Sequence, residues 1–244
     1  MPLIKNFTTP RWALLALGLA LACSALAAAQ TPPGLREVHD HDGSMVSLGF
    51  MGIAAVPVRT FAYDVNTAGG GSMDLLVNFD RHGNAALRFE GAYIQYGNEH
   101  QLVPVPGSGG LYAYDVNTRF YISSLRAGPQ LQFGPSRVRV YLFGTAGLAY
   151  FATRTSVDGD GCACGETNFD DTALSLAAGG GLRLALSSGR RPVSLTLGTS
   201  YVHNQQVDYL RPGDITFTSQ GYEVSPVRND VDFVTFEVGL KFAL

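Results

Sequence analysis

His203 is the side chain in this sequence best suited to acid–base chemistry, because an imidazole titrates near neutral pH. The nearest serine before it is Ser200, three positions earlier. Side chains three residues apart in a strand face opposite sides, so Ser200 and His203 should not act together. A lipid-active enzyme that uses His203 is therefore an alternative only, and the sequence predicts that the protein is not an enzyme.

Two segments carry side chains that could bind a metal ion. Segment 158–166 has closely spaced carboxylates of the kind that bind Ca²⁺, but it lacks the ligand set of an EF-hand. Segment 39–42 alternates His and Asp within a polar stretch. A solvated acidic loop and an incidental cluster are the simpler interpretations. The sequence therefore predicts no metal site and no cofactor.

Cys162 and Cys164 are the only cysteines after Cys23. Disulfides persist outside the cytosol, but a bridge between residues two apart is strained. The sequence leaves the redox state of this pair open.

Charged side chains of both signs recur on one face of the strands predicted below. That face is otherwise rich in Gly, Ser and Thr, which suits the crowded interior of a narrow barrel. Inward charges could pair across the lumen, whereas unpaired burial would be costly; solvated surface charges are the alternative. The predicted polar network of the lumen consists of Asp74, Arg88, Glu90, Arg126, Arg139, Arg183, Glu237 and Lys241.

The elements that must position these charges are strands, because apolar residues alternate with small or polar ones from Met45 onward. In the first strand, Met51 and Ile53 make both faces apolar, which indicates either a local core inside the barrel or a shifted register. The predicted strands cover residues 45–56, 72–80, 85–97, 118–133, 138–152, 172–187, 192–203 and 231–244.

The connections between these strands alternate between tight turns and segments of roughly 15 to 28 residues, a length uncommon in compact soluble domains. This rhythm is typical of a closed antiparallel up-and-down transmembrane β-barrel, an all-β fold, with short periplasmic turns and long extracellular loops. One hexapeptide recurs, at 62–67 and 113–118, either as the trace of a duplicated hairpin or by chance.

Aromatic residues on the apolar face lie toward the ends of the strands. Two girdles one hydrophobic thickness apart are the pattern of a membrane interface, although aromatics also favour strands in general. The predicted girdles consist of Tyr93, Tyr121, Tyr150 and Tyr201 at the loop end and Phe79, Phe133 and Phe242 at the turn end.

Residues 1–29 have the features of a secretory signal peptide: Lys5 and Arg11, a short apolar run, and small residues before Gln30. Lipidation at Cys23 is the rival route, but the residues before it match poorly. Residues 30–44 are predicted to be a flexible leader and 45–244 the barrel. Without the signal peptide the net charge falls from −3 to −5, which argues against binding of nucleic acid.

The chain resembles the small eight-stranded outer-membrane barrels of the OmpA/OmpX type. The resemblance covers about 45–244 and includes glycine-rich strands at 125–131 and 177–182 and an alternating last strand, 233–244, in which Phe242 has the expected parity. Leu244 stands where such barrels usually end in phenylalanine. The resemblance implies a location in the bacterial outer membrane, with membrane lipid and the barrel-assembly machinery as partners.

The expected function is a structural or surface-interaction role, with an extracellular partner at the long loops. Loops 98–117 and 204–230 are the expected contact regions, and the second is expected to form an external hairpin around residues 215–217. Two further alternatives are a narrow pore, in which lumen charges would select ions, and a soluble secreted barrel that binds a small apolar ligand. Side chains filling an eight-stranded interior argue against conduction.

Overall fold

The computed structural model describes residues 45–80, 83–104, 113–135, 137–158, 164–187, 192–218 and 221–244. The predicted signal peptide, the predicted leader, the His and Asp cluster at 39–42, and Cys162 lie outside these residues. Of segment 158–166, residues 159–163 also lie outside them. None of the helices in the described part of the chain is long and apolar enough to cross a membrane.

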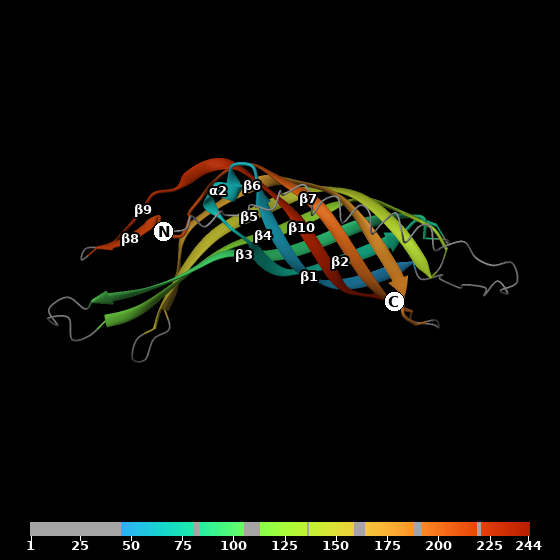
Figure 1. The fold of residues 1–244 in the computed structure, drawn as a ribbon, viewed down its shortest axis with the longest axis horizontal. Coiled ribbons are helices and arrows are strands. Elements are labelled where there is room, and N and C mark those ends of the chain that lie inside the picture. The colour runs from blue at the N-terminus through green and yellow to red at the C-terminus, as the bar shows by residue number, and fades with distance from the viewer. Residues whose placement is uncertain are drawn as a thin grey trace, which may run out of the picture. The chain divides into compact units, whose positions relative to one another are not determined.

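Eight antiparallel strands close into a barrel, which confirms the predicted fold (Figure 1). Each strand pairs with its neighbour in the chain, and the first strand pairs with the last from Ser47–Ala243 to Val58–Asp232. The strands are β1 (Val46–Val58), β2 (Ala68–Asn78), β3 (Ala85–Pro104), β4 (Ala113–Phe133), β5 (Val138–Asp158), β6 (Cys164–Ala185), β7 (Val193–Tyr209) and β10 (Val227–Ala243).

Two smaller elements lie at the loop end of the barrel. A single helical turn, α2 (Phe61–Asp64), follows β1 and packs against β1 and β10. After β7, the strands β8 (Ile215–Thr218) and β9 (Gly221–Val224) form the external hairpin that the sequence predicted.

The apolar face of the strands points outward, as predicted. Leu125 is 75% exposed on the outer wall, whereas Arg88, which has the opposite parity, is fully buried. Met51 and Ile53 are buried inside the barrel, so the two apolar faces of the first strand reflect a local core and not a shifted register. Outward leucines and inward charges are the reverse of a soluble barrel, which contradicts the soluble alternative.

The strands β3 to β6 are longer than the sequence predicted. They contain 20 to 22 residues each, whereas a transmembrane strand needs only about 9 to 11. The ladder between β3 and β4 continues to the pair Pro104–Ala113, so much of the expected loop 98–117 is strand. The prediction was wrong here because polar residues on both faces hide the alternation once a strand leaves the membrane.

The wall of the barrel divides near the loop end. Pairing between β6 and β7 stops at Ser175–Asn204, while β5 and β6 stay paired as far as Val157–Cys164. Above that point the backbone N–H of Asp208 donates a hydrogen bond to the Asp171 carboxylate across the seam (2.8 Å).

Candidate functional site

Arg88 is at the centre of an ionic cluster inside the barrel. Its Nη1 lies 3.0 Å from Asp74 Oδ2, its Nη2 lies 2.6 Å from Glu90 Oε2, and its Nη2 is 3.8 Å from Glu237 Oε2. The Nη1 also donates to Gln130 Oε1 (3.3 Å). Three carboxylates around one buried guanidinium compensate for the loss of its hydration.

Two further cations extend this cluster. Arg126 forms an ion pair with Glu90 and donates to Ser175 Oγ (3.3 Å), and Lys241 Nζ lies 2.7 Å from Asp74 Oδ2. We call the connected set the charged layer; it consists of Asp74, Arg88, Glu90, Arg126, Glu237 and Lys241.

The other two charges predicted for the lumen lie nearer the turn end. Arg139 Nη1 donates to the backbone carbonyl of Gly83 (3.4 Å). Arg183 donates to Ser194 Oγ (3.2 Å) and to Gln132 Oε1 (3.3 Å). Arg139 and Arg183 thus bond polar groups on the turn side of the charged layer.

Aromatic side chains also face the charged layer, and the sequence interpretation missed them. The Arg88 guanidinium carbon lies 4.4 Å from the centre of the Phe143 ring, which is a cation–π contact. The Tyr141 ring stacks on that of Phe143, with centroids 6.2 Å apart. Both residues have the inward parity of β5, so parity was the signal that could have identified them.

Toward the loop end the interior becomes apolar. Four residues along β3 and β4, from the pair Glu90–Arg126 to the pair Ile94–Ile122, charged side chains give way to aliphatic ones. That step is about 13 Å along a strand. We call this second level the apolar layer; its large members are Ile94, Phe120, Ile122, Phe151, Val202 and Phe233, each at most 3% exposed.

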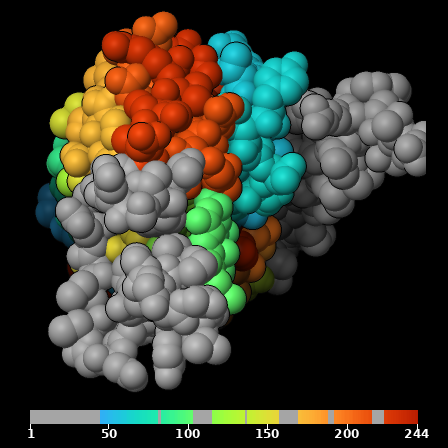
Figure 2. Space-filling model, turned by 90° about the vertical axis from the view of Figure 1, so that its left-hand side faces the viewer, coloured from blue at the N-terminus to red at the C-terminus, as the bar shows by residue number. Residues whose placement is uncertain are grey.

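The α2 segment (59–65) closes the apolar layer from above. Phe61 points inward and makes edge contacts with Tyr96 (centroids 5.7 Å apart) and Tyr209 (5.5 Å apart). Each such aromatic pair contributes about 0.5–1.5 kcal/mol beyond the area that it buries. Figure 2 shows the loop end, where the cyan segment that contains α2 lies beside the orange and red segments of the later strands.

Polar contacts hold α2 in place. The Tyr209 hydroxyl donates to Asp64 Oδ2 (2.5 Å), and Arg211 Nη1 lies 3.1 Å from Asp64 Oδ1. The Arg211 guanidinium donates hydrogen bonds to Asp214 and to Asp64, and these bonds raise its pKa above the ordinary value for arginine. The Tyr96 hydroxyl completes the closure by donating to the Leu210 carbonyl (3.1 Å).

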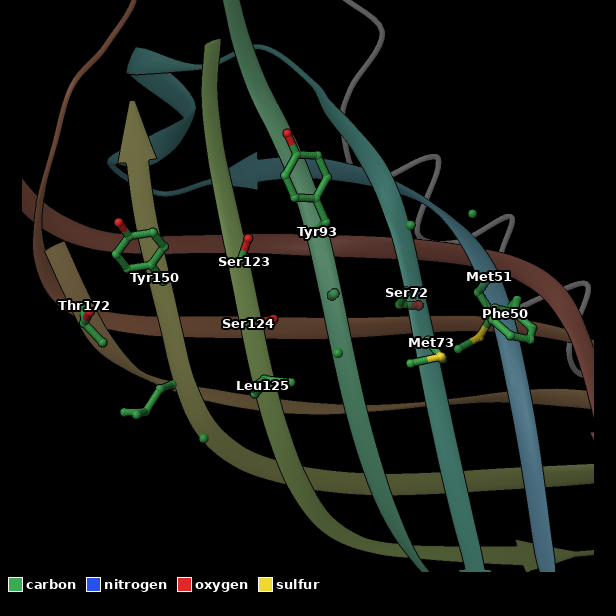
Figure 3. Close-up of a pocket in the computed structure, with 16 residues that line it drawn as sticks. Phe50, Met51, Ser72, Met73, Tyr93, Ser123, Ser124, Leu125, Tyr150 and Thr172 are labelled. Atoms are coloured by element: carbon green, nitrogen blue, oxygen red, sulfur yellow. The ribbon is translucent and has the colours of Figure 1, made fainter. Parts of the chain in front are cut away.

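The aromatic residues predicted as girdles lie on the outer wall. The rings of Tyr93 and Tyr121 are neighbours there, with centroids 5.4 Å apart. Between these tyrosines and the middle of the barrel is a shallow outer hollow of about 960 Å³, walled by Phe50, Met73, Leu125 and Tyr150 among others (Figure 3). Inward residues such as Met51, Ser72 and Ser124 also line the hollow, so it lies at the wall of the barrel where the two faces of the strands meet.

His203 lies on the outer face of β7 and has a partner that the sequence did not reveal. Its Nδ1 lies 2.6 Å from Asp232 Oδ1, directly across the ladder between β7 and β10. Ser200 faces the lumen, where its hydroxyl bonds that of Thr235 (2.7 Å), so the two side chains are on opposite sides. Within the described residues, no group of three or more His, Cys, Asp and Glu side chains is arranged to hold a metal ion.

Several solved structures are similar to this chain at low identity. Neisserial surface protein A (NspA) has 15% identity, with 82% of this chain and 98% of that chain covered and a TM-score of 0.49. Ail, the attachment invasion locus protein of Yersinia pestis, has 16% identity, 81% and 95% coverage and a TM-score of 0.41. The N-terminal β-barrel domain of Pseudomonas aeruginosa OprF has 14% identity, 80% and 96% coverage and a TM-score of 0.38.

No curated protein matches the sequence. A family model does match, over residues 13–243, which is nearly the whole chain, and it describes the outer membrane protein beta-barrel domain. With its outward leucines and closed eight-stranded wall, the chain belongs to the outer membrane protein β-barrel family and is a protein of the bacterial outer membrane.

Proposed function

We propose that this protein is a non-conducting barrel that presents an ordered surface to partners outside the cell. The observation that carries the proposal is the filling of the lumen at two levels, the charged layer and the apolar layer. Charged side chains such as Arg88 and Glu90 form ion pairs with one another and are fully or almost fully buried, so they are not available to a passing ion.

The external surface consists of ordered elements. The strands β3 to β6 continue beyond the length needed to span the membrane, and the β8–β9 hairpin projects beside them. Exposed apolar residues mark this end: Tyr63 on α2 is 91% exposed, while Phe61, two residues earlier, is buried. A protein that anchors an exposed tyrosine so firmly offers a preorganised contact, the kind that carries much of the energy of an interface.

The last strand, β10, carries the features that bear on assembly of the barrel into the outer membrane. In β10 the outward residues Phe236, Val238, Leu240 and Phe242 alternate with inward polar ones. We propose that the barrel-assembly machinery recognises this strand, as the resemblance to OmpA/OmpX-type barrels implies.

Single-channel recording on the purified protein in planar bilayers tests the closed lumen. We expect no conductance above background for the wild type or for Arg126→Ala, because the apolar layer still closes the barrel in that variant. A porin measured in the same bilayers shows that channels would be detected. Steady conductance by the wild type would establish the pore alternative instead.

Excision of the hairpin tests the surface role. The backbone N–H of Ser225 donates to the Asp214 carbonyl (3.1 Å), so the base of the hairpin is closed and residues 215–224 can be replaced by two glycines. Cells that display the wild type, this deletion or Tyr63→Ala are compared for binding to arrays of extracellular glycans and matrix proteins. We expect binding by the wild type that both changes weaken, with equal amounts of heat-modifiable barrel. Equal binding by all three displays and by cells without the protein contradicts the surface role.

A further inference from the structure

An acidic side chain lies on the outer wall where the strands meet the loop end. Asp232 has the same parity in β10 as the lipid-facing residues Val234 and Phe236, yet it is only 1% exposed. The side chains that cover it are His203, at 2.6 Å from Oδ1, and Arg59, whose Nη1 lies 3.2 Å from Oδ2. Each carboxylate oxygen thus has its own cationic or hydrogen-bonding partner.

Arg59 is held in this position by a special backbone conformation. It is the only non-glycine among the described residues with a positive φ, 54°. This left-handed backbone conformation is unfavourable for any residue that has a Cβ atom, and it persists only where the surrounding structure enforces it. Here the turn after β1 aims the arginine along the outer wall, where its guanidinium carbon lies 6.0 Å from the centre of the Tyr201 ring.

A hollow of about 410 Å³ lies beside this arginine. Arg59, His203 and Tyr201 form its polar side, and Leu176 and Ala178 of β6 form its apolar side. Leu176 pairs with His203 and Ala178 with Tyr201 in the β6–β7 ladder, so the polar and apolar walls are neighbouring outward residues. The small side chain of Ala178 leaves the space open.

We propose that this hollow binds the phosphate of an anionic lipid headgroup in the outer leaflet, one in which no choline-like cation neutralises the phosphate. Arg59 is 68% exposed, so most of its guanidinium N–H groups remain free to donate to phosphate oxygens after one has paired with Asp232. The apolar wall continues directly into the lipid-facing surface, which suits an acyl chain attached to the same headgroup. Asp232, His203 and Tyr201 are positioning residues that fix the arginine.

Lipid preference measured at this site tests the proposal. A tryptophan reporter replaces Leu174, an outward residue of β6 next to the hollow, in the full chain with Trp12→Phe so that it is the only tryptophan. The protein is reconstituted into vesicles that contain brominated phosphatidylglycerol or brominated phosphatidylcholine mixed with the unbrominated lipids. Bromine quenching then reports which lipid occupies the neighbourhood of the reporter.

We expect the anionic lipid to be preferred about fivefold at this reporter and not at a matched reporter, Leu125→Trp, on the outer wall of β4. Arg59→Gln should abolish the preference and Arg59→Lys should retain most of it, while Arg119→Gln, which removes an exposed charge from β4, should leave it unchanged. A heat-modifiability gel shows that each variant is folded. Equal quenching by the two lipids at Leu174→Trp, or an undiminished preference in Arg59→Gln, would overturn the proposal.

Discussion

The two levels of the barrel interior solve the same packing problem with opposite chemistry. The charged layer fills the lumen with ion pairs such as Arg88–Asp74, whereas the apolar layer fills it with side chains such as Phe120 and Phe151. Ion pairs fix geometry, because every buried charge depends on its partner. Apolar packing tolerates rearrangement and can be completed by a loop segment, here α2. The comparison indicates a rigid lower level and an upper level whose order depends on the chain outside the wall.

The largest effect is expected from the charged layer. Arg88→Ala leaves Asp74, Glu90 and Glu237 without their shared cation and should destabilise the folded barrel by about 3–5 kcal/mol. The measurement is urea unfolding of the barrel reconstituted in vesicles, followed by tyrosine fluorescence. Arg154→Ala, which removes an exposed arginine of β5, should change stability by less than about 0.5 kcal/mol. Similar values for the two variants would mean that the buried charges are not interdependent.

A smaller effect is expected from the apolar layer. Phe61→Ala removes a buried ring and its contacts with Tyr96 and Tyr209, which should cost about 2–3 kcal/mol in the same unfolding measurement. Tyr63→Ala is the control on the same helical turn, since its side chain is exposed, and it should be nearly neutral. A loss from Phe61→Ala as large as that from Arg88→Ala would contradict the distinction between the two levels.

The smallest effect is expected from the contacts that hold α2. Asp64→Asn weakens the ion pair with Arg211 and should cost about 1 kcal/mol, because both side chains are partly solvated. The change should appear as faster hydrogen exchange at the Val65 N–H, which bonds the Phe61 carbonyl (3.1 Å), and not at amides of the charged layer. Asp115→Asn on exposed β4 is the control. If exchange accelerates equally in both levels, α2 is not an independent unit.

Alternation in the sequence predicted which face of each strand is apolar, and that was enough for the fold and its orientation. It did not predict where strands end, because beyond the membrane neither face needs to be apolar. The repeated hexapeptide shows the limit: at 62–67 it includes part of α2, whereas at 113–118 it is strand β4. Its conformation depends on the ladder partners available to the second copy and on the packing of Phe61 before the first.

Contacts across the ladder could not be predicted for a related reason. His203 and Asp232 are 29 positions apart, and they meet because β7 and β10 pair in one particular register. That register includes a shift between Asn229 and Val231, which the alternation of apolar residues does not reveal. The division of the lumen into two layers depends likewise on which inward residues of eight strands share a level.

The outer rim of the barrel is weakest at the seam between β6 and β7. Beyond Ser175–Asn204 the two strands share no ladder, and the Asp171 carboxylate joins them through the Asp208 amide. When a bulky molecule binds at this rim, the outer ends of β6 and β7 should separate along the seam while the membrane-embedded cylinder keeps its shape. The barrel thus combines a stiff membrane-embedded cylinder with an outer rim that can open sideways.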